Sequence, residues 1–256
     1  MNSSRSSAAA VRDVPCVILV GGLGTRLRPV LDDLPKPMAA VAGKPFLEYL
    51  IRWLRQEGIQ RVILCTGYRS DKIEQYFQSG DRFGLHIEYS VEQEPQGTWG
   101  AIRQACHLVT EPVFLVLNGD SWLQIELVQL LDYHVRRSGI ATIGAVKMTD
   151  ASRFGALDVD SSGRIIAFQE KKGLGDSLIN GGVYVFSHDA LAMAPAEASS
   201  LEKEVFPMLL PYGVFAMPVR GYFVDIGIPE EYKRLQVGAE SWMEILRLPN
   251  GGANAC

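Results

Sequence analysis

Residues 16–22 read CVILVGG, an apolar run that ends at two glycines. A continuous apolar run of this kind is typical of a parallel strand that is buried on both faces of a sheet. Glycines directly after such a strand let backbone N–H groups approach a ligand, because no Cβ stands in the way. The stretch therefore predicts a buried strand followed by a ligand-binding loop.

The next part of the chain repeats this order of strand and helix. We expect helices at 45–57, 71–77 and 98–109, and buried strands at 61–66, 85–90 and 112–120. This repetition with short connections predicts an α/β fold with a Rossmann-like, doubly wound and mainly parallel mixed sheet. Such sheets bind ligands at the carboxyl ends of their strands, where GGLGTR (21–26) and NGD (118–120) both fall.

The second half of the chain has a different pattern. After a predicted helix at 126–137, we expect strands with little helix between them, at 141–148, 155–160, 164–171 and 180–187. Residues 161–163, Ser-Ser-Gly, are typical of a hairpin turn, so this half adds mixed or antiparallel strands. Two further helices are expected, at 202–210 and 229–247. We interpret 14–245 as one domain, with a disordered tail at 1–13 and a flexible tail at 246–256.

The composition excludes several classes of protein. The chain has 256 residues, a formal net charge of −4, 47% apolar and 21% charged residues. These values exclude wholesale disorder, and an acidic chain without a long basic run argues against nucleic acid as a partner. No stretch reaches the roughly 18 consecutive apolar residues of a membrane helix, and the start lacks the apolar segment of a secretion signal. We expect a cytoplasmic protein with no membrane partner.

Cysteine and histidine form no metal or disulfide pattern. Buried thiols in a reducing cytoplasm explain the four cysteines, which include no CxxC pair: Cys16, Cys65, Cys106 and Cys256. The four histidines lack metal-ligand spacing, and we expect them at surface or hydrogen-bonded positions: His86, His107, His134 and His188. No GxSxG motif of a serine nucleophile occurs.

The strongest chemical signal is GGLGTRLRPVLDDLPKPM at 21–38. Backbone N–H groups of a glycine-rich turn form a nest for anionic oxygens, and the planar guanidinium of Arg26 grips phosphate oxygens in pairs. Lys36 stands between two prolines, and a stiff loop places its charge with little loss of entropy on binding. The alternative, a plain glycine turn with two solvated cations, does not account for the whole string. The string is neither a Walker A loop nor a clean GxGxxG motif.

This string resembles the signature of sugar-1-phosphate nucleotidyltransferases, GGxGTRLxPxTxxxPKPM followed by GKPxLE, which stands here as GKPFLE at 43–48. The resemblance continues to about residue 235, with Leu31-Asp32 where the family often has Thr. It implies the nucleotidyltransferase fold, with an added antiparallel portion that binds the sugar. It also implies a nucleotide site made by Leu19, Gly21, Gly22, Gly24, Thr25, Arg26 and Gly119.

Two aspartates are candidate ligands of Mg²⁺. Asp120 follows a central strand and faces the phosphate loop, and Mg²⁺ takes one or two carboxylates together with phosphates and waters. The alternative for Asp120 is a turn residue that caps the next helix. The segment YFVDIGIPEEY at 222–232 resembles the family's W-x-D-[IV]-G element, which implies that Asp225 is the second ligand.

The resemblance also implies residues for the sugar phosphate. FQEKK at 168–172 is similar to the family's FxEKP, so Lys171 would hold the phosphate and Glu170 the sugar hydroxyls. Lys172 stands where the family has Pro, and strand alternation puts Glu170 and Lys172 on one face, so the assignment requires a twist or bulge. Three further residues would surround the sugar, although Asn-Gly is also common in plain hairpins: Gly155, Asn180 and Gly182.

The segment EPQGTWGA at 94–101 is close to the family's EPLGTGGA. Gly97 and Thr98 would lie along the nucleoside, and Trp99, where the family has a small residue, would turn outward or narrow the site. Glu92 favours guanine, because its N1–H and N2–H₂ are adjacent donors that a carboxylate can accept. The alternative is that Glu92 faces solvent.

The function implied is Mg²⁺-dependent transfer of a nucleotidyl group from a nucleoside triphosphate, with GTP favoured, to a sugar 1-phosphate. The phosphate oxygen is already a competent nucleophile, so catalysis means neutralising charge and aligning the reactants, by Arg26, Lys36, Asp120, Lys171 and Asp225. The whole pattern most resembles family members that use D-glycero-D-manno-heptose 1-phosphate to supply GDP-heptose for surface glycans such as lipopolysaccharide.

Four alternatives stay open. Two are other reactions of the same family: a mannose-1-phosphate guanylyltransferase and a glucose-1-phosphate thymidylyl- or uridylyltransferase. A third is a regulatory subunit that binds sugar nucleotides without turnover. A Rossmann dehydrogenase fits worse, because Cys65-Thr66 stand where an acidic residue is expected. The oligomeric state is open, and a homo-oligomer is compatible with the sequence.

Overall fold

The computed structural model describes residues 11–22, 34–149, 154–169 and 176–238. The first half alternates strands and helices: β1 (Cys16–Leu19), β2 (Ala40–Val41), β3 (Lys44–Pro45), α2 (Phe46–Gln56), β4 (Arg61–Thr66), α3 (Ser70–Phe77), β5 (His86–Val91), α4 (Gly97–Ala105) and β6 (Val113–Asn118). The second half contains β7 (Ser121–Leu123), α5 (Leu127–Arg137), β8 (Ala141–Met148), β9 (Ala156–Val159), β10 (Ile165–Gln169), β11 (Ser177–Ser187), α6 (Ala190–Met193), α7 (Phe206–Leu209), β12 (Val214–Val219), β13 (Phe223–Asp225) and α8 (Pro229–Val237).

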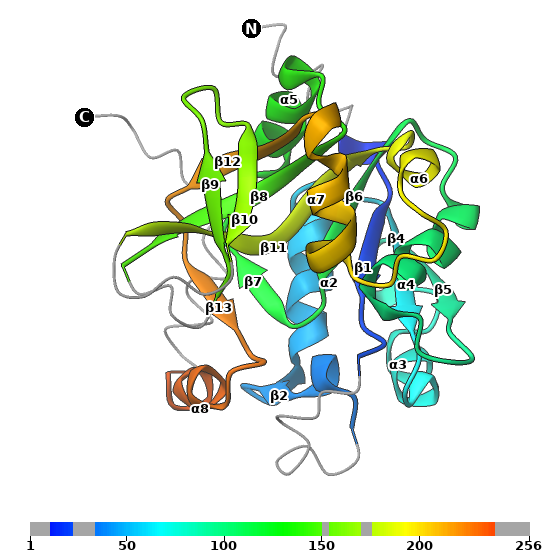
Figure 1. Cartoon of the computed structure of the whole chain (residues 1–256). Coiled ribbons are helices and arrows are strands. Elements are labelled where there is room, and N and C mark those ends of the chain that lie inside the picture. Colours follow the sequence, from blue (N-terminus) through cyan, green and yellow to red (C-terminus); the bar gives the residue numbers. More distant parts are fainter. Residues whose placement is uncertain (1–10, 23–33, 150–153, 170–175, 239–256) are drawn as a thin grey trace, which may run out of the picture.

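The predicted mainly parallel mixed sheet is confirmed. A nine-stranded sheet carries β5, β4, β1 and β6 side by side in parallel. β11 continues it antiparallel to β6, and β8 and β12 follow on the far side of β11. The predicted hairpin turn at 161–163 joins β9 and β10, which pair antiparallel. Figure 1 shows the parallel strands on one side of the molecule and the antiparallel strands on the other.

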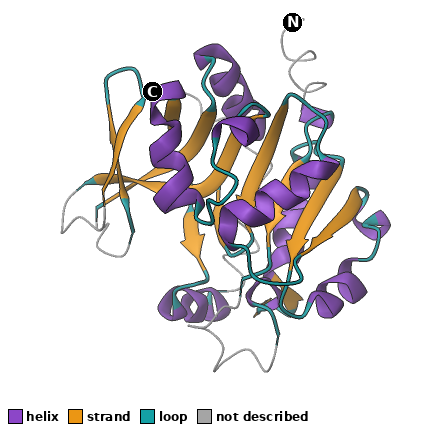
Figure 2. Ribbon diagram, turned by 45° about the vertical axis from the view of Figure 1, so that its right-hand side comes forward, coloured by secondary structure: helices purple, strands orange, loops and turns teal. Residues whose placement is uncertain are grey.

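The sheet is buried on both faces, as the apolar run at 16–20 predicts. Successive residues of β1 point to opposite sides: Cys16 and Ile18 lie in one core and Val17 in the other. Apolar residues of α2, α3, α5 and α8 fill the first core, and those of α4, α6 and α7 fill the second. Figure 2 shows these helices on the two faces of the sheet. Two packed layers of helices therefore hold the strand ends in fixed positions.

β11 bends where it reaches the pocket described below. Its C-terminal part, from Val183, pairs with β6, whereas Leu178 and Ile179 pair with β9. The register against β8 shifts between Asn180 and Val183. Gly182 has φ +74°, a left-handed conformation that favours glycine, so the residue type permits the bend. One strand thereby joins the parallel and the antiparallel halves of the sheet.

Several local expectations need correction. β12 was not predicted as a strand. It contains Pro218 and pairs only with β8 among the named strands, and proline is tolerated on such an edge strand. Residues 202–210 do not form one α-helix, since a π-helical turn, Leu201–Val205, precedes α7. Val11 falls in the predicted disordered tail at 1–13, but it is only 2% exposed and belongs to the first core.

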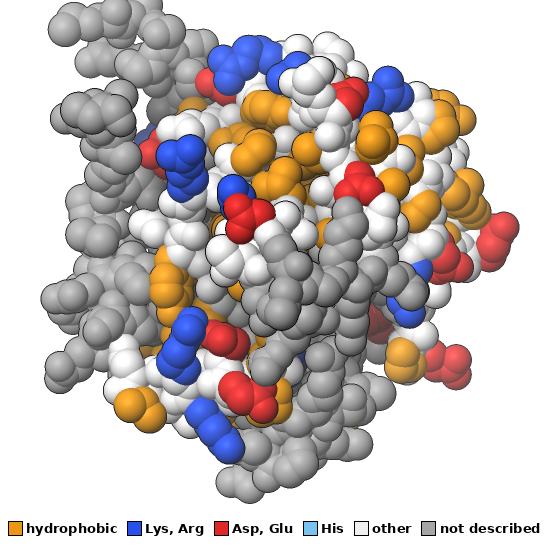
Figure 3. Space-filling view, turned by 60° about the vertical axis from the view of Figure 1, so that its left-hand side comes forward, with side chains coloured by type: hydrophobic (Ala, Val, Ile, Leu, Met, Phe, Trp, Pro, Cys, Tyr) orange, Lys and Arg blue, Asp and Glu red, His pale blue; other side chains and the backbone are white. Residues whose placement is uncertain are grey.

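The surface and the thiols agree with the composition. In the part of the chain that the structure describes, the cysteines are buried and free: Cys16, Cys65 and Cys106. None of the helices in these described ranges has the length and apolar character needed to cross a bilayer. On the face in Figure 3, lysine and arginine side chains are scattered among acidic and apolar ones. Cys256 lies outside the described residues.

Candidate active site

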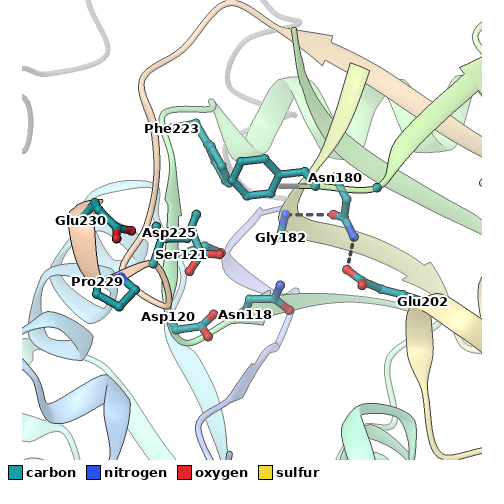
Figure 4. A pocket seen from close by; sticks show the side chains of 13 residues that line it. Asn118, Asp120, Ser121, Asn180, Gly182, Glu202, Phe223, Asp225, Pro229 and Glu230 are labelled. Carbon is teal, nitrogen blue, oxygen red and sulfur yellow. Dashed lines mark hydrogen bonds between the residues drawn. The ribbon is translucent and has the colours of Figure 1, made fainter. Parts of the chain in front are cut away.

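A pocket of about 520 Å³ lies where several strands end (Figure 4). Its described lining comes from β6, β7, β11, β13, the π-helical turn, the start of α8 and the segment before β9: Asn118, Asp120, Ser121, Phe154, Gly155, Asn180, Gly182, Glu202, Phe223, Asp225, Ile228, Pro229 and Glu230. Because segments remote in the sequence meet here, this pocket is the candidate active site.

The structure brings Asp120 and Asp225 together. Asp120 is not followed by a helix, so it is not a helix cap; β7 begins directly after it and pairs antiparallel with β13. In this pairing Ser121 lies opposite Asp225, and the N–H of Ile226 donates to the carbonyl oxygen of Asp120 at 2.9 Å. The carboxylate of Asp225 accepts the N–H of Gly227 at 2.6 Å. The two predicted metal ligands therefore line one pocket from adjacent strands.

Lys36 reaches the same place from the other end of the sequence. It begins a 3₁₀ turn, Lys36–Met38, and stands between Pro35 and Pro37. Its Nζ lies 2.5 Å from Oδ2 of Asp120, and its side chain is 15% exposed. A Cβ at Gly227 would collide with Nζ of Lys36 and lie 2.7 Å from Oδ1 of Asp225. The ammonium group thus lies between the two aspartate-bearing segments.

The residues of this pocket fit a magnesium ion. Mg²⁺ needs one or two carboxylates besides phosphates and waters, and Asp120 and Asp225 supply them. Ser121 adds an orphaned oxygen: its Oγ is buried and has no hydrogen-bond partner among the described residues. Ser121 shares a face with Asp225, because directly opposed residues of antiparallel strands do so. No group of three or more metal-ligating side chains occurs in the described ranges, so phosphates and waters would complete the shell.

Glu92 faces a second pocket, of about 260 Å³, rather than open solvent. The described lining of this pocket is Gly21, Gly67, Tyr68, Glu92, Gln93, Glu94 and Pro95. Oε1 of Glu92 accepts the N–H of Gln96 at 3.0 Å. Oε2 points at the glycine turn, since a Cβ at Gly21 would lie 2.8 Å from it. Burial raises the pKa of Glu92, and the Gln96 hydrogen bond opposes this shift. The alternative of a solvated Glu92 is therefore wrong.

The start of α4 packs against the segment that leads into the π-helical turn. Gly97 has φ +77°, and a Cβ there would lie 2.5 Å from the carbonyl oxygen of Ser199. Oγ1 of Thr98 accepts the N–H of Leu201 at 2.8 Å. Gly97 and Thr98 are absent from the described lining of the second pocket, so their nucleoside role stays a prediction.

Trp99 neither turns outward nor narrows the site. It is fully buried in the second core, with its ring centroid 6.0 Å from that of Phe186. The family pattern indicated a large residue at an unusual place but not the direction of its side chain. Trp99 belongs to the buried face of α4, together with Ala101, Ile102 and Ala105.

Leu19 and Gly119 lie back to back at the ends of β1 and β6. The N–H of Gly119 donates to the carbonyl oxygen of Leu19 at 3.0 Å. A Cβ at Gly119 would lie 2.5 Å from that oxygen, so glycine is required for the strands to approach. At Gly22 a Cβ would meet nothing within 4 Å, which leaves open space beside the turn. The remaining predicted residues lie outside the described ranges: Gly24, Thr25, Arg26, Glu170, Lys171 and Lys172.

Gly155, Asn180 and Gly182 all line the first pocket, as expected for residues around a sugar. Sequence reasoning missed Ser121, Glu202 and the aromatic pair Phe154 and Phe223, whose ring centroids are 5.7 Å apart. Glu202 belongs to the stretch 202–210, which was interpreted as a helix. The position of Ser121 directly after Asp120 was the signal that could have revealed it.

The fold and this site define a nucleotidyl-transferring enzyme, and the comparisons agree. The family model described as "Nucleotidyl transferase" matches residues 16–241, and the chain belongs to that family. A D-glycero-alpha-D-manno-heptose 1-phosphate guanylyltransferase of Aneurinibacillus thermoaerophilus is 40% identical over 227 residues, covering 86% of this chain and 96% of the relative. A mannose-1-phosphate guanylyltransferase of Mycobacterium tuberculosis is 38% identical over 230 residues, covering 88% of this chain and 64% of the relative.

Solved structures share this fold. HddC from Yersinia pseudotuberculosis, complexed with GMP-PN, superposes with a TM-score of 0.78 at 34% identity, over 88% of this chain and 98% of HddC. A putative glucose-1-phosphate thymidylyltransferase from Bacillus anthracis has a TM-score of 0.77 at 21% identity, over 88% of this chain and 95% of that chain, and supports the fold alone. The resemblance to sugar-1-phosphate nucleotidyltransferases is thus confirmed at the level of the family.

Proposed function

We propose that this enzyme transfers a guanylyl group from GTP to D-glycero-D-manno-heptose 1-phosphate, releasing pyrophosphate and a GDP-sugar for surface-glycan synthesis. The observation that carries the transfer chemistry is the meeting of Asp120 and Asp225 in one pocket beside Lys36. The choice of heptose is supported by the Aneurinibacillus relative and by a Campylobacter jejuni relative of the same printed name, 39% identical over 218 residues. The free, buried cysteines of the described chain suit a reducing compartment, so we infer a cytoplasmic reaction.

Charge balance supports the cofactor. The pocket is lined by four carboxylates, Asp120, Glu202, Asp225 and Glu230, yet its proposed ligands are polyanions. The ammonium group of Lys36 contacts this lining, but it is already paired with Asp120. Further positive charge is needed, and we infer Mg²⁺ at Asp120 and Asp225 with the hydroxyl of Ser121 nearby. When bound, the ion would neutralise phosphate charge and allow the two anions to approach.

The protein's own residues then align the reactants. The attacking phosphate oxygen needs no general base, so the barrier is set by repulsion and orientation. Lys36 is held rigidly by its flanking prolines and by Asp120, which places positive charge where the triphosphate would lie. We expect Arg26 and the glycine turn to hold the departing pyrophosphate and Lys171 to hold the acceptor phosphate. These last roles rest on the family resemblance.

The preference for guanine follows from the orientation of Glu92. Guanine presents N1–H and N2–H₂ as adjacent donors, and a carboxylate with one oxygen aimed into the pocket can accept them. Uracil and thymine present a single N–H between two carbonyl oxygens, which a carboxylate would repel. When a base without these donors binds, the carboxylate is left without a hydrogen-bond partner, which costs free energy. The contact therefore discriminates strongly between guanine and the pyrimidines.

A substrate matrix tests the proposal. Purified enzyme with Mg²⁺ is offered ATP, GTP, CTP or UTP against heptose, mannose and glucose 1-phosphates, and pyrophosphate release is measured. We expect GTP with the heptose phosphate to give the highest kcat/KM. Preference for mannose 1-phosphate would support a second candidate function, mannose-1-phosphate guanylyltransferase, which is the printed activity of the Mycobacterium relative. Sugar-nucleotide binding without pyrophosphate release from any pair would favour the regulatory subunit and overturn the proposal.

Glu92→Gln tests the base contact separately. We expect the KM for GTP to rise about tenfold or more, because one acceptor is replaced by an amide that can offer a donor to the guanine N–H groups. The KM for the sugar 1-phosphate should stay within about twofold. Glu197→Gln, at an exposed carboxylate absent from the described lining of both pockets, serves as the control. An unchanged KM for GTP would remove Glu92 from base recognition.

A further inference from the structure

The side-chain amide of Asn180 is engaged within the protein. Its Oδ1 accepts the N–H of Gly182 at 3.0 Å. Its Nδ2 donates to the hydroxyl of Tyr184 at 2.9 Å and to Oε1 of Glu202 at 2.8 Å, as the dashed lines of Figure 4 show in part. A primary amide has two N–H donors, and both are used here. Asn180 therefore has no donor left for a sugar hydroxyl.

Tyr184 holds the side-chain amide of Asn180 from the core side. Its side chain is fully buried, with ring centroids 5.4 Å from Phe206 and 6.3 Å from Phe186. Burial raises the pKa of Tyr184, so its hydroxyl stays protonated, and Asn118 also forms a hydrogen bond with it. A buried aromatic side chain in a packed core has little freedom, so the amide of Asn180 has a rigid support.

Glu202 is presented by a turn that is anchored on both sides. The first and last residues of this turn, Leu201 and Val205, are buried in the second core. Leu201 donates its N–H to Thr98 Oγ1, and Lys203 donates its N–H to Ser200 Oγ at 3.1 Å. Oε1 of Glu202 is taken by Asn180, whereas Oε2 has no hydrogen-bond partner in the described part of the chain. One oxygen is thus held in place and the other is available at the pocket.

We propose that Oε2 of Glu202 accepts hydrogen bonds from hydroxyl groups of the acceptor sugar, and that Asn180 is a positioning residue which orients this carboxylate. The inference rests on the proposed function and assigns the sugar end of its acceptor. Glu202 selects hydroxyls because a carboxylate accepts from O–H groups and repels a phosphate.

The shape of the pocket supports this assignment. In Figure 4 Glu202 and Asp225 approach from opposite sides, so a phosphate near the aspartates leaves the ring pointing toward Glu202. Phe154 and Phe223 form an apolar wall suited to the C–H groups of a pyranose. A ligand with a phosphate at one end and several hydroxyls at the other matches this distribution of charge. A manno-configured sugar 1-phosphate is a ligand of this class.

Steady-state kinetics with Glu202→Gln and Glu202→Ala tests the proposal, using the sugar 1-phosphate that the wild-type enzyme turns over fastest. We expect the KM for the sugar 1-phosphate to rise about 10- to 100-fold, while the KM for GTP and kcat stay within about threefold. Glu197→Gln is the matched control, and melting temperatures verify that each variant is folded. A sugar KM within twofold of the wild type for folded Glu202→Ala would overturn the proposal.

Deoxy sugar 1-phosphates, each lacking one hydroxyl, locate the contact. For the analogue that lacks the bound hydroxyl, wild type and Glu202→Gln should have the same KM, whereas the other analogues should keep the difference. An equal loss for every analogue would mean a structural effect and would refute the assignment. Asn180→Ala should raise the sugar KM alone, and its combination with Glu202→Ala should cost no more than Glu202→Ala, because the two act as one unit.

The two proposals fail differently. If the wild-type enzyme releases no pyrophosphate with any sugar 1-phosphate, the proposed function is wrong and the role of Glu202 falls with it. If the wild type turns over and the folded Glu202 variants keep its sugar KM, only the present inference is wrong.

Discussion

The contacts of Lys36 agree better with its proposed function than with a role in stability. Its ion pair with Asp120 is partly exposed, with side chains 15% and 35% accessible, and partly exposed pairs contribute little to folding. The two flanking prolines restrict the backbone at the same position. Fixing this loop costs conformational entropy, and we attribute its rigidity to the positive charge that Lys36 places at the pocket.

Lys36→Ala should therefore lower kcat about 10²- to 10³-fold, the loss expected when one group that stabilises developing charge is removed. The melting temperature should change by less than about 2 °C, because a partly exposed ion pair contributes little. Pyrophosphate release and thermal unfolding are the two measurements, and Lys233→Ala, at an exposed position on α8, is the control. A folded variant with wild-type turnover would exclude Lys36 from the chemistry.

The hydroxyl of Ser121 should lower the stability of the metal-free protein while it contributes to binding of Mg²⁺. Its buried hydroxyl lacks a partner, and an unsatisfied buried polar group costs about 1–3 kcal/mol. Ser121→Ala should raise the unfolding free energy of the metal-free enzyme by up to about 1 kcal/mol. It should also reduce the additional stability that Mg²⁺ confers. Urea unfolding with EDTA and with Mg²⁺ measures both effects, with Ser161→Ala in the hairpin turn as the control. Equal stabilisation of both proteins by Mg²⁺ would remove Ser121 from the metal site.

At the scale of elements, the bend in β11 forms the floor of the pocket. Gly182 has φ +74°, and a side chain there would collide with Oγ of Ser121 and lie 3.1 Å from Nδ2 of Asn118. The same glycine lets β11 leave the ladder with β6 and join β9. The backbone conformation and the shape of the site therefore depend on one residue.

Gly182→Ala should destabilise the protein by more than about 1 kcal/mol and abolish most turnover, because strain and collision add. Gly43→Ala separates the two causes. Gly43 also has a positive φ, +78°, but a Cβ there would meet nothing within 4 Å. It should cost about 1 kcal/mol and leave kcat unchanged. Similar activity losses in both variants would show that general destabilisation, and not the pocket floor, is responsible.

Periodicity predicted those elements whose pattern is set by burial alone. β4 has the predicted bounds, 61–66, because every residue but the first is buried. β12 could not be predicted in this way, because Pro218 breaks its pattern and only the neighbouring β8 makes it a strand. Asp120 and Asp225 were predicted as partners only through the family motif, and their proximity depends on β7 and β13, which are too short to leave a sequence signal. Glu202 requires the π-helical turn, which no simple periodicity encodes.

At the scale of the whole molecule, acid stability should depend on His134. It is 3% exposed, and burial lowers its pKa from 6.5 to about 4. Ser187 donates its hydroxyl to the carbonyl oxygen of Gly139 and so accepts from Nε2 of His134, which leaves Nδ1 to accept from Thr142. The neutral ring is therefore satisfied on both sides, and protonation would require an additional donor to be accommodated.

Between pH 6.5 and 4 the unfolded chain binds a proton at His134 that the folded chain does not. Stability should consequently fall as the pH decreases through this window, by at most about 3 kcal/mol from this residue. His134→Gln should flatten the pH dependence of urea unfolding, whereas His86→Gln, at an exposed position, should not. A slope that persists in folded His134→Gln would assign the acid sensitivity to other groups.

The ladder that β11 forms with both β6 and β9 has a consequence for how substrates enter and leave. Many enzymes with two substrates close by rotating one lobe against another about a hinge. Here the parallel and the antiparallel halves of the sheet share the backbone hydrogen bonds of one continuous strand, and a rotation of that kind would have to break them. Admission and release must therefore be governed locally, at the rim of the pocket.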